Sequence, residues 1–262
     1  QTMALASLAE GVADRLEGGF QVKSFDVYDI DEHEVQRLAM ARMSSATELD
    51  GPEGQALAAD LQAALENALV ALARDGMASN PSDRMFLSGG VALNCCANSR
   101  IRDALGVDVW VTHAAHDAGT ALGAALEAAH LVGEPPPSPI LDAGLGPSYG
   151  RDACGRALAD AGLRGQENAL VLAVERLLRG EVLGFFQSGM EFGPRALGHR
   201  SIVAHAGWAR IADRVNRIKG RQPWRPFGPA VLAERALDVF EDDAFGPFMT
   251  FTTTVRDSMR EK

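Results

Sequence analysis

The chain has 262 residues, enough for one large domain or two ordinary ones, and its composition is globular, with 47% hydrophobic and 23% charged residues. The net charge of −10 argues against general binding to nucleic acids or membrane surfaces. The three cysteines are odd in number and two of them are neighbours, which argues against a disulfide framework and favours a reducing, cytoplasmic location.

The first part of the chain alternates helices and strands. Leucines at spacings of three and four predict an amphipathic helix over residues 51–75. A short buried strand over 84–87, a helix over 91–105, a β-branched strand over 107–111 and an Ala-rich, closely packed helix over 118–131 follow. This order of elements indicates an α/β layer architecture.

A linker rich in proline and glycine separates this part from the next. Proline lacks a backbone donor and fixes φ, so the proline cluster that begins at Pro135 fits neither a helix nor a central strand. Glycines continue the irregular stretch as far as Gly150. We therefore predict a domain portion over residues 1–134, a linker over 135–150 and a second portion over 151–262.

The second part mixes helices and strands without strict alternation, which indicates an α+β arrangement. Its predicted helices cover residues 168–179 and 208–219. Its predicted strands cover residues 182–187, 201–204, 230–232 and 247–255. Position 1 is not Met, no signal-peptide pattern opens the chain, and the last residues break off a Thr-rich strand pattern. We therefore expect a piece of a longer protein.

The first segment with chemical potential is the turn that follows strand 84–87. Its Gly89-Gly90 pair before a helix leaves backbone N–H groups free at a helix N-terminus, where the helix dipole favours a phosphate. Glycine also lets the backbone approach a ligand closely. Many such turns only connect two elements, so both interpretations stay open. The thiols of Cys95 and Cys96, which follow, are more typical of packing than of a reactive pair.

A second segment gathers three possible metal ligands within five residues. Asp117 could cap the helix that follows it, or it could bind a divalent metal beside a nucleotide phosphate. His113 and His116 could add nitrogen ligands. Metal sites usually collect ligands from distant segments, so both interpretations stay open here as well.

The third and fourth segments carry most of the positive charge. Residues 195–225 contain eight Lys or Arg and one acidic residue, Asp213, in a chain that is acidic overall. Because these bases stand among glycines, prolines and aromatic residues, an anion site is favoured over a solvated basic face. Arginine binds carboxylate or phosphate oxygens through two parallel hydrogen bonds, and Glu191 could pair with one arginine to hold it. Trp224 and Phe227 could stack on a base or pack in the core.

The four segments together, in this order, resemble the NodU/CmcH-type carbamoyltransferases. The family's Gly-Gly-Val-Ala-Leu-Asn segment is matched at 89–94, and its Asp-x-Gly-x-Ala-Leu-Gly-Ala segment at 117–124. Its Met-Glu-Phe-Gly-Pro-Arg-Ala-Leu-Gly-x-Arg-Ser segment is matched at 190–201, and its Lys-x-Arg and Arg-Pro-Phe-x-Pro segment within 216–230. The resemblance runs from about residue 49 to residue 255.

The resemblance implies a fold and an activity. It implies the later half of an actin-like (ribonuclease H-like) α/β domain, followed by part of a YrdC-like α+β domain. The second domain would form carbamoyl adenylate from carbamoyl phosphate and ATP. The first would pass the carbamoyl group to a hydroxyl of a sugar or natural product, with a divalent metal, iron or magnesium, assisting. The implied partners are thus small molecules, without nucleic acid or membrane.

The resemblance also assigns residues. The nucleotide turn would comprise Ser88, Gly89, Gly90, Val91 and Asn94. The metal ligand would be Asp117. The catalytic residues would be the basic side chains around carbamoyl phosphate and the ATP phosphates, namely Arg195, Arg200, Lys219 and Arg225. Two further residues, Arg221 and His199, would line the nucleotide site.

The chain departs from the family at two positions, and two other functions compete. His116 replaces a glycine before the metal-binding aspartate, and residues 204–207 lack an expected acid and arginine. The segment with the family's metal-binding histidines is expected before residue 1. A threonylcarbamoyl-type tRNA-modifying enzyme would share residues 88–94 and Asp117, but not the third and fourth segments. A non-catalytic nucleotide-binding fragment is the other alternative.

Overall fold

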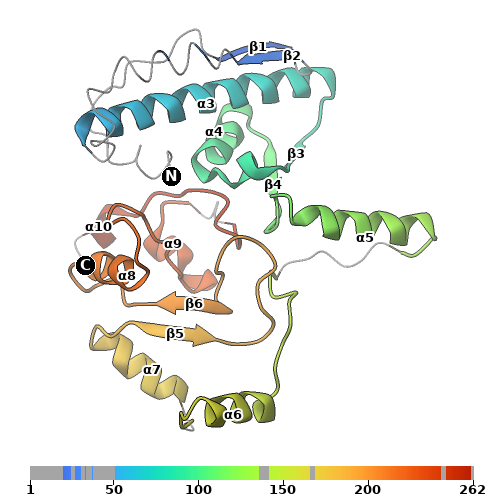
Figure 1. The fold of residues 1–262 in the computed structure, drawn as a ribbon. Coiled ribbons are helices and arrows are strands. Elements are labelled where there is room, and N and C mark those ends of the chain that lie inside the picture. The colour runs from blue at the N-terminus through green and yellow to red at the C-terminus, as the bar shows by residue number, and fades with distance from the viewer. Residues whose placement is uncertain are drawn as a thin grey trace. The chain divides into compact units, whose positions relative to one another are not determined.

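The computed structural model describes residues 20–24, 27–30, 33, 37, 51–135, 142–165, 169–242 and 246–260, and these form two compact units (Figure 1). The first unit spans residues 1–111 together with 224–226 and 250–252. The second unit spans residues 112–223, 227–249 and 253–260, as far as the description reaches. The described fold is mixed α/β, with helices and small two-stranded sheets.

The described residues of the first unit form two small sheets. Strands β1 (Phe20–Ser24) and β2 (Val27–Ile30) form an antiparallel hairpin. Strands β3 (Arg84–Leu87) and β4 (Asp108–Val111) pair in parallel, as expected for strands joined by a helical crossover. Within β4, Val109 and Val111 are buried while Trp110 between them is exposed, so one face of this sheet packs inward.

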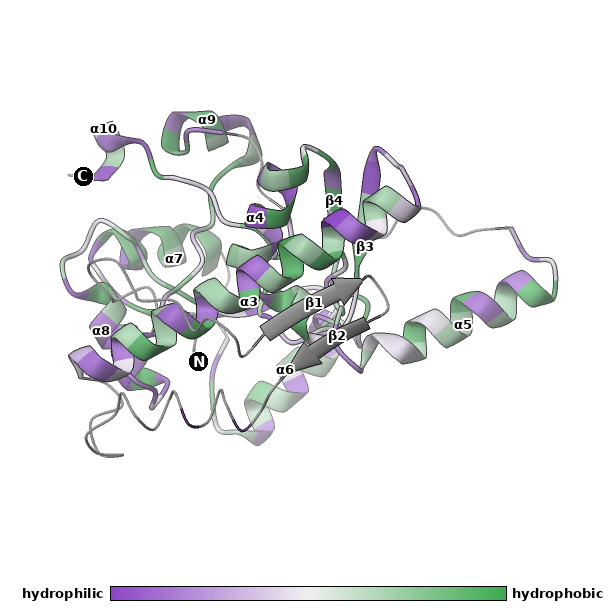
Figure 2. Cartoon of the chain, turned by 90° about the horizontal axis from the view of Figure 1, so that it is seen from above, coloured by the Kyte–Doolittle hydropathy of each residue, from purple (hydrophilic) through white to green (hydrophobic). Residues whose placement is uncertain are grey.

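Helix α3 (Pro52–Ser79) supplies much of the core of the first unit and confirms the predicted amphipathic helix. By length and composition alone it is the one described helix that could cross a membrane. Buried apolar side chains such as Leu57 and Val70 accompany the buried polar Gln62, and Figure 2 shows hydrophilic and hydrophobic residues mixed along the helix. A partly buried helix of this kind is typical of a protein core.

The predicted helix over 91–105 is interrupted near its start. Residues Gly90–Leu93 form a 3₁₀ turn, and helix α4 begins at Cys95 and ends at Leu105. The break has a local cause, because the Asn94 side chain accepts a hydrogen bond from the Ala97 N–H and caps α4. Gly106, in a left-handed conformation, ends the helix.

In the second unit, the described residues form one antiparallel sheet and several short helices. Strand β5 (Leu183–Phe186) pairs with β6 (Arg200–Val203), with Phe186 opposite Arg200. Helix α7 (Ala169–Leu178) leads into β5, and helix α8 (Ile211–Ile218) follows β6. The carbonyls at the end of α7 are bound by side chains from before and within α8: Trp208 Nε1 donates to Leu178, and Arg214 donates to Gly180.

Helix α5 (Gly119–Leu131) also belongs to the second unit, and its environment differs from the prediction. Its small residues led us to expect close packing, yet none of its residues is buried, and Leu131 is 76% exposed. Small side chains permit close packing without ensuring it, so this part of the prediction was wrong for the described residues.

The end of the chain also differs from the prediction. The expected strands over 230–232 and 247–255 do not form. Instead the structure has a 3₁₀ turn (Ala233–Arg235), helix α9 (Ala236–Val239) and helix α10 (Asp257–Arg260), with a single bridge between Phe240 and Val255. Met249 has a left-handed φ of 55°, which a continuous strand does not tolerate. Helix α6 (Arg151–Asp160) was not predicted.

Candidate functional site

The glycine turn after β3 lies in the first unit and is open on its glycine side. Gly89 has a φ of 98°, a conformation that favours glycine. A Cβ added at Gly89 or Gly90 would meet no atom within 4 Å, so close packing does not explain why these two positions are glycine. Ser88 and Val91 beside them are exposed. The turn therefore has a backbone that a ligand could approach closely.

Asn94, at the end of this turn, is directed inward. Its amide exchanges two hydrogen bonds with the Gln62 amide of α3, at 3.0 and 3.1 Å, and its oxygen also caps α4. These three hydrogen bonds tie the turn to helices α3 and α4. In this structure Asn94 shapes the predicted nucleotide turn, and whether it also touches a ligand stays a prediction.

Of the two cysteines that follow the turn, Cys96 does not have the features of a reactive thiol. Cys95 and Cys96 are half-buried and reduced. The hydrogen bond with Cys95, together with burial, raises the pKa of Cys96 well above its usual range. A reactive cysteine needs a lowered pKa, so a packing role is favoured.

His113, in the second unit, is buried between two aromatic rings. It is 3% exposed, and its ring lies 6.2 Å from Phe192 in an edge-on arrangement and 5.1 Å from Phe248. Its Nε2 is buried and has no hydrogen-bond partner among the described residues. Burial lowers the pKa of His113, with Asp142 opposing the shift, so the neutral imidazole is favoured.

Asp117 lies two residues before α5 and is exposed. The described N-terminus of α5 has no side-chain cap hydrogen bond, so the capping interpretation finds no support there. Within the described part of the chain, no three His, Cys, Asp or Glu side chains lie close enough together to hold a metal ion. A metal bound by Asp117 would need ligands from outside these residues.

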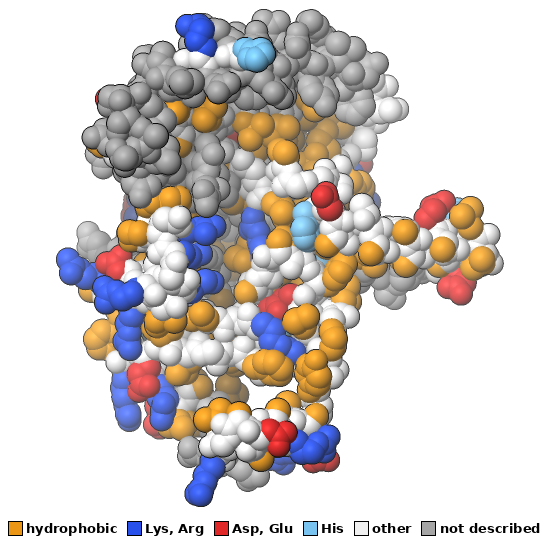
Figure 3. All heavy atoms as spheres, in the orientation of Figure 1, with side chains coloured by type: hydrophobic (Ala, Val, Ile, Leu, Met, Phe, Trp, Pro, Cys, Tyr) orange, Lys and Arg blue, Asp and Glu red, His pale blue; other side chains and the backbone are white. Residues whose placement is uncertain are grey.

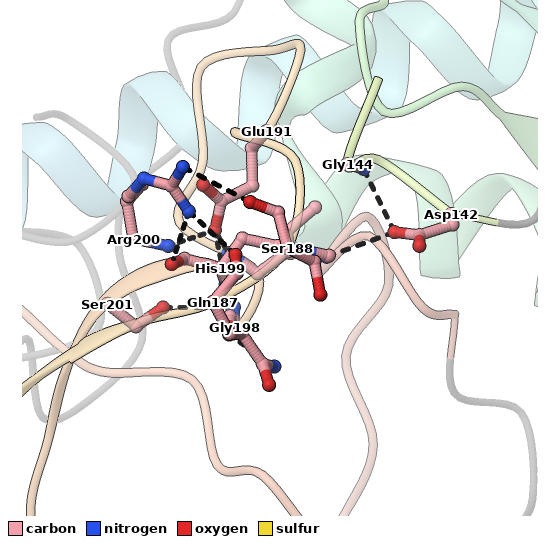
Figure 4. Close-up of polar contacts among 10 residues, drawn as sticks. Asp142, Gly144, Gln187, Ser188, Glu191, Gly198, His199, Arg200 and Ser201 are labelled. Carbon is pink, nitrogen blue, oxygen red and sulfur yellow. Dashed lines mark hydrogen bonds and ion pairs between the residues drawn. The ribbon is translucent and has the colours of Figure 1, made fainter. Parts of the chain in front are cut away.

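Glu191 organises the loop between β5 and β6 (Figure 4). One oxygen of its carboxylate, Oε1, accepts hydrogen bonds from three backbone N–H groups, those of Leu197 at 2.8 Å, His199 at 2.8 Å and Arg200 at 3.0 Å. Burial opposes ionisation, but the backbone N–H groups outweigh it and lower the pKa of Glu191 to about 2. The suggested ion pair with an arginine is therefore replaced by an anion bound to backbone amides.

Arg200 uses its guanidinium mainly on backbone carbonyls. It donates to Gln187 at 2.6 Å, to His199 at 3.0 Å and to Ser188 at 3.2 Å, and it lies 3.5 Å above the Phe186 ring centroid. These contacts close the loop at the point where β6 begins. Arg200 therefore holds the loop together in this structure, and contact with an anion stays a prediction.

His199 is positioned by Asp142. Its Nε2 lies 3.0 Å from Asp142 Oδ1, and the same carboxylate oxygen accepts the Gly144 N–H at 2.9 Å (Figure 4). A Cβ at Gly144 would lie 2.6 Å from the His199 ring, so only glycine leaves room for it. The backbone N–H of Gly144 lowers the pKa of Asp142 most, and His199 lowers it further, whereas burial opposes the shift.

Arg195 is held by the far end of the chain. Its guanidinium donates to the Met249 carbonyl, 54 residues away in sequence. Nearby in sequence, Gly193 has a φ of 139°, and a Cβ there would lie 2.4 Å from the His113 carbonyl. The second and third segments thus meet within the second unit, at His113 and Gly193.

The fourth segment is divided between the units. Asn216 is buried, binds the Arg221 guanidinium and donates to the Pro223 carbonyl at 2.9 Å. Arg221 also lies 4.3 Å from the Phe227 ring centroid. Lys219 follows α8, and Figure 3 shows Lys and Arg side chains gathered at the left of the view, where Figure 1 draws that helix. Arg225 belongs to the first unit, so its predicted place beside Lys219 stays a prediction.

Two models of one protein family match the chain. The model of the carbamoyltransferase N-terminus matches residues 15–126, and the model of the carbamoyltransferase C-terminus matches residues 174–262. Both are in the expected order, and together they cover most of the chain.

The chain belongs to the carbamoyltransferase family. This is a family of enzymes, and the predicted resemblance is confirmed. The candidate segments 88–94 and 113–117 fall within the N-terminal match, and residues 190–225 fall within the C-terminal match. The structure brings residues 113 and 193 of the two matches together, which the sequence alone did not show.

Several curated proteins resemble this carbamoyltransferase-family chain. Nodulation protein NolNO of Sinorhizobium fredii is 40% identical over 78% of the chain and 32% of its own length. Nodulation protein NolO of Bradyrhizobium diazoefficiens is 37% identical over 77% of the chain and 39% of its own length. The 3'-hydroxymethylcephem-O-carbamoyltransferase of Amycolatopsis lactamdurans is 32% identical over 80% of the chain and 39% of its own length. The chain thus matches about a third of the length of these relatives.

Sequence reasoning missed three residues that shape the site. Asn98 and Gln62 are buried polar residues on helices, and Asp142 lies in the middle of the predicted linker. A signal was present for Asn98, which stands between the buried residues Ala97 and Ile101 where an apolar side chain is usual. No comparable signal marked Asp142, because its contact with His199 spans 57 positions of the chain.

Proposed function

We propose that the protein is an ATP-dependent O-carbamoyltransferase, which activates carbamoyl phosphate with ATP and passes the carbamoyl group to a hydroxyl of a sugar or natural product. The observation that carries this proposal is the match of both carbamoyltransferase models to one chain, in order. Relatives named 3'-hydroxymethylcephem-O-carbamoyltransferase support a hydroxyl acceptor. Because the chain matches about a third of their length, the activity is assigned to the whole protein that contains it.

Carbamoyl transfer needs activation because of the chemistry of the carbamoyl group. Its nitrogen donates electron density into the carbonyl, which makes the carbon a poor electrophile. Carbamoyl phosphate, ATP and water would give carbamoyl adenylate, phosphate and pyrophosphate. The acceptor hydroxyl would then attack the carbonyl carbon and lose its proton, and AMP would leave.

We assign the activation step to the basic residues of the C-terminal match. Arg195 extends from a glycine-rich loop whose shape is fixed by Glu191, and it donates to the Met249 carbonyl. A phosphate oxygen is a stronger acceptor than a carbonyl, so a bound phosphate would compete for this guanidinium. Lys219 and Arg221 would add positive charge beside it, with His199 at its edge. Arg200 would hold the loop closed around this group, since its donors already bind carbonyls.

We assign the transfer step to the N-terminal match, as part of an actin-like domain, with a YrdC-like domain in the C-terminal match. Residues 88–91 would bind the nucleotide through exposed backbone, and Arg225, which belongs to the same unit, would contribute charge. The described residues do not form a metal site, so no step is assigned to a metal. Asp117 would bind one if ligands from elsewhere join it.

The C-terminal match disfavours a threonylcarbamoyl-type tRNA-modifying enzyme, because that alternative does not account for residues 190–225. An experiment distinguishes the other alternative, a non-catalytic nucleotide-binding fragment, from an enzyme. We would purify the 262-residue chain and, where the coding sequence continues, the longer product, and measure pyrophosphate release from ATP with and without carbamoyl phosphate. Release that depends on carbamoyl phosphate supports the proposal. Nucleotide binding without any release by either protein would contradict it.

A further inference from the structure

The ring of His113 lies between two aromatic residues that come from distant parts of the second unit. Its centroid is 6.2 Å from that of Phe192, on the loop between β5 and β6, and 5.1 Å from that of Phe248. The backbone is also in close contact, because a Cβ at Gly193 would lie 2.4 Å from the His113 carbonyl oxygen. His113 thus joins the loop to the segment around residue 248, and all four residues belong to one unit.

Arg195 spans the same two segments. It follows Phe192 on the loop, and its guanidinium donates to the carbonyl of Met249, the residue next to Phe248. The backbone that carries the arginine and the carbonyl that receives it therefore each lie beside an aromatic ring that packs on His113. Both ends of this contact depend on where these two rings stand.

Other contacts fix the loop on either side of the stretch that His113 supports. The Phe192 N–H donates to the Ala143 carbonyl at 2.7 Å. The Glu191 carboxylate accepts the N–H of Leu197 and of two residues beyond it (Figure 4). Between these anchors, the backbone at Gly193 lies against the His113 carbonyl. His113 thus supports the part of the loop that leads into Arg195.

The ring of His113, and not its nitrogen, makes these contacts. Nε2 is buried and has no hydrogen-bond partner among the described residues. Burial lowers the pKa of His113 against the opposing effect of Asp142, so the buried ring is neutral. A buried nitrogen without a partner opposes stability, whereas the packing of a ring against two others favours it. A side chain that keeps the ring and lacks the nitrogen should therefore preserve the arrangement.

We infer that His113 is a positioning residue for Arg195, because its ring separates and orients the two aromatic residues that flank the ends of the arginine contact. The consequence for activation of carbamoyl phosphate rests on the proposed function. The structural part stands without that function.

The first experiment uses hydrogen exchange on the 262-residue chain and needs no activity. His113→Ala should speed exchange of the Phe192 N–H by on the order of tenfold or more, because the Phe192 ring loses its neighbour. His113→Phe should restore slow exchange. The Val215 N–H, buried within α8 of the same unit, should be unaffected in both variants. His205→Ala is the matched control, since this exposed histidine only accepts the Gly207 N–H, at 3.1 Å, among the contacts described here.

The exchange result has two outcomes that overturn the inference. Unchanged exchange at Phe192 in His113→Ala would show that the ring does not hold the loop. Equal acceleration at Phe192 and Val215 would show general destabilisation of the unit, not local positioning. Neither outcome depends on whether the protein is a carbamoyltransferase.

The second experiment measures pyrophosphate release for wild type, for His113→Ala, for Arg195→Ala and for the double variant. Positioning makes the two effects depend on each other, whereas independent sites give additive free energies. His113→Ala should lower kcat/KM by roughly tenfold in wild type but by less than about threefold when Arg195 is already Ala. His113→Phe should stay within about threefold of wild type, because the ring is retained.

Equal fold-losses from His113→Ala in both backgrounds would overturn the positioning of Arg195. A loss in His113→Phe as large as that in His113→Ala would show that the nitrogen is needed, as in a contact with a ligand or metal, and would also overturn it. Absence of release in wild type would instead contradict the proposed function and leave the exchange result to decide the structural part.

Discussion

Two glycine-rich segments of the molecule use glycine for different reasons. In the turn of the first unit, Gly90 has open space where a side chain would stand. In the loop of the second unit, a Cβ at Gly189 would lie 2.3 Å from the Gly144 carbonyl oxygen, and one at Gly193 would lie 2.4 Å from the His113 carbonyl oxygen. The loop needs glycine in order to fold, whereas packing gives no reason for Gly90. A ligand that approaches the backbone would provide one.

The two segments also treat their backbone N–H groups differently. The loop satisfies three of them internally, with the carboxylate of Glu191. A phosphate at the loop would therefore be bound by side chains, chiefly Arg195, and not by a nest of backbone amides. The turn keeps its glycines exposed. This contrast leads to four predictions, which begin with the largest expected effect.

Gly193→Ala should destabilise the second unit by about 4 kcal/mol or more, because it combines a backbone clash with a strained φ. Gly150→Ala is the control, since a Cβ there meets nothing within 4 Å and φ is −72°. Urea denaturation of both variants measures the difference. Similar midpoints for the two would show that the loop does not pack on the His113 segment as described.

Glu191→Ala should cost roughly 2–3 kcal/mol, because three N–H groups lose a charged acceptor, whereas Glu191→Gln keeps an oxygen in place and should cost less. The pKa of Glu191 is lowered from 4.5 to about 2, so the folded state prefers the ionised form. Its contribution to stability is therefore complete above about pH 4.5 and is lost as the pH falls towards 2. Denaturation at pH 7 and pH 3 should show a smaller pH dependence in Glu191→Gln than in wild type. An identical pH dependence in both proteins would show that the ionised Glu191 carboxylate does not stabilise the loop.

Gly90→Ala should change the free energy of unfolding by less than about 0.5 kcal/mol, since nothing opposes the added methyl group. It should weaken ATP binding by roughly tenfold if the backbone of the turn contacts the nucleotide. Calorimetric titration with ATP measures this affinity, and a denaturation curve measures stability. Unaltered ATP affinity would show that the turn only connects β3 to α4 and does not bind the nucleotide.

Asp142→Asn should have the smallest effect, below about 0.5 kcal/mol on stability, because the Asp142 side chain is 71% exposed and salt screens such pairs. The His199 ring should nevertheless lose its charged partner. The NMR resonances of the His199 ring, measured at pH 7, should therefore differ between the variant and wild type. Identical ring resonances in the two proteins would show that the contact has no role in solution.

The sequence predicted local elements better than the contacts between them. Strand β3 and helix α3 follow from periodicity and glycine or proline boundaries, and the structure agrees on both. The inward amide of Asn94 and the amide-bound carboxylate of Glu191 did not follow, because a motif shows residue types but not the direction of side chains. The Arg195–Met249 and Asn98–Thr250 contacts span 54 and 152 positions, and no local pattern encodes such pairs.

For the candidate site too, the sequence predicted residue types better than contacts between distant residues. The residue types of the four segments, together with the family resemblance, were enough to name Arg195, Asp117 and the Gly89-Gly90 turn as candidates. The sequence did not reveal that the His113 segment meets Gly193, or that Arg200 is engaged by carbonyls. Both depend on how the loop folds back on itself, which local spacing leaves undetermined.

The central claim is that the N-terminal match and the C-terminal match serve two different steps, and one paired measurement tests it most directly. Arg195→Ala and Asp117→Ala would each be assayed for pyrophosphate release with carbamoyl phosphate and ATP, and for transfer from preformed carbamoyl adenylate to an acceptor. The account predicts that Arg195→Ala loses activation, by roughly 3–4 kcal/mol of transition-state stabilisation, and keeps transfer, whereas Asp117→Ala does the reverse. Equal loss of both steps in both variants would contradict the account and indicate one shared site.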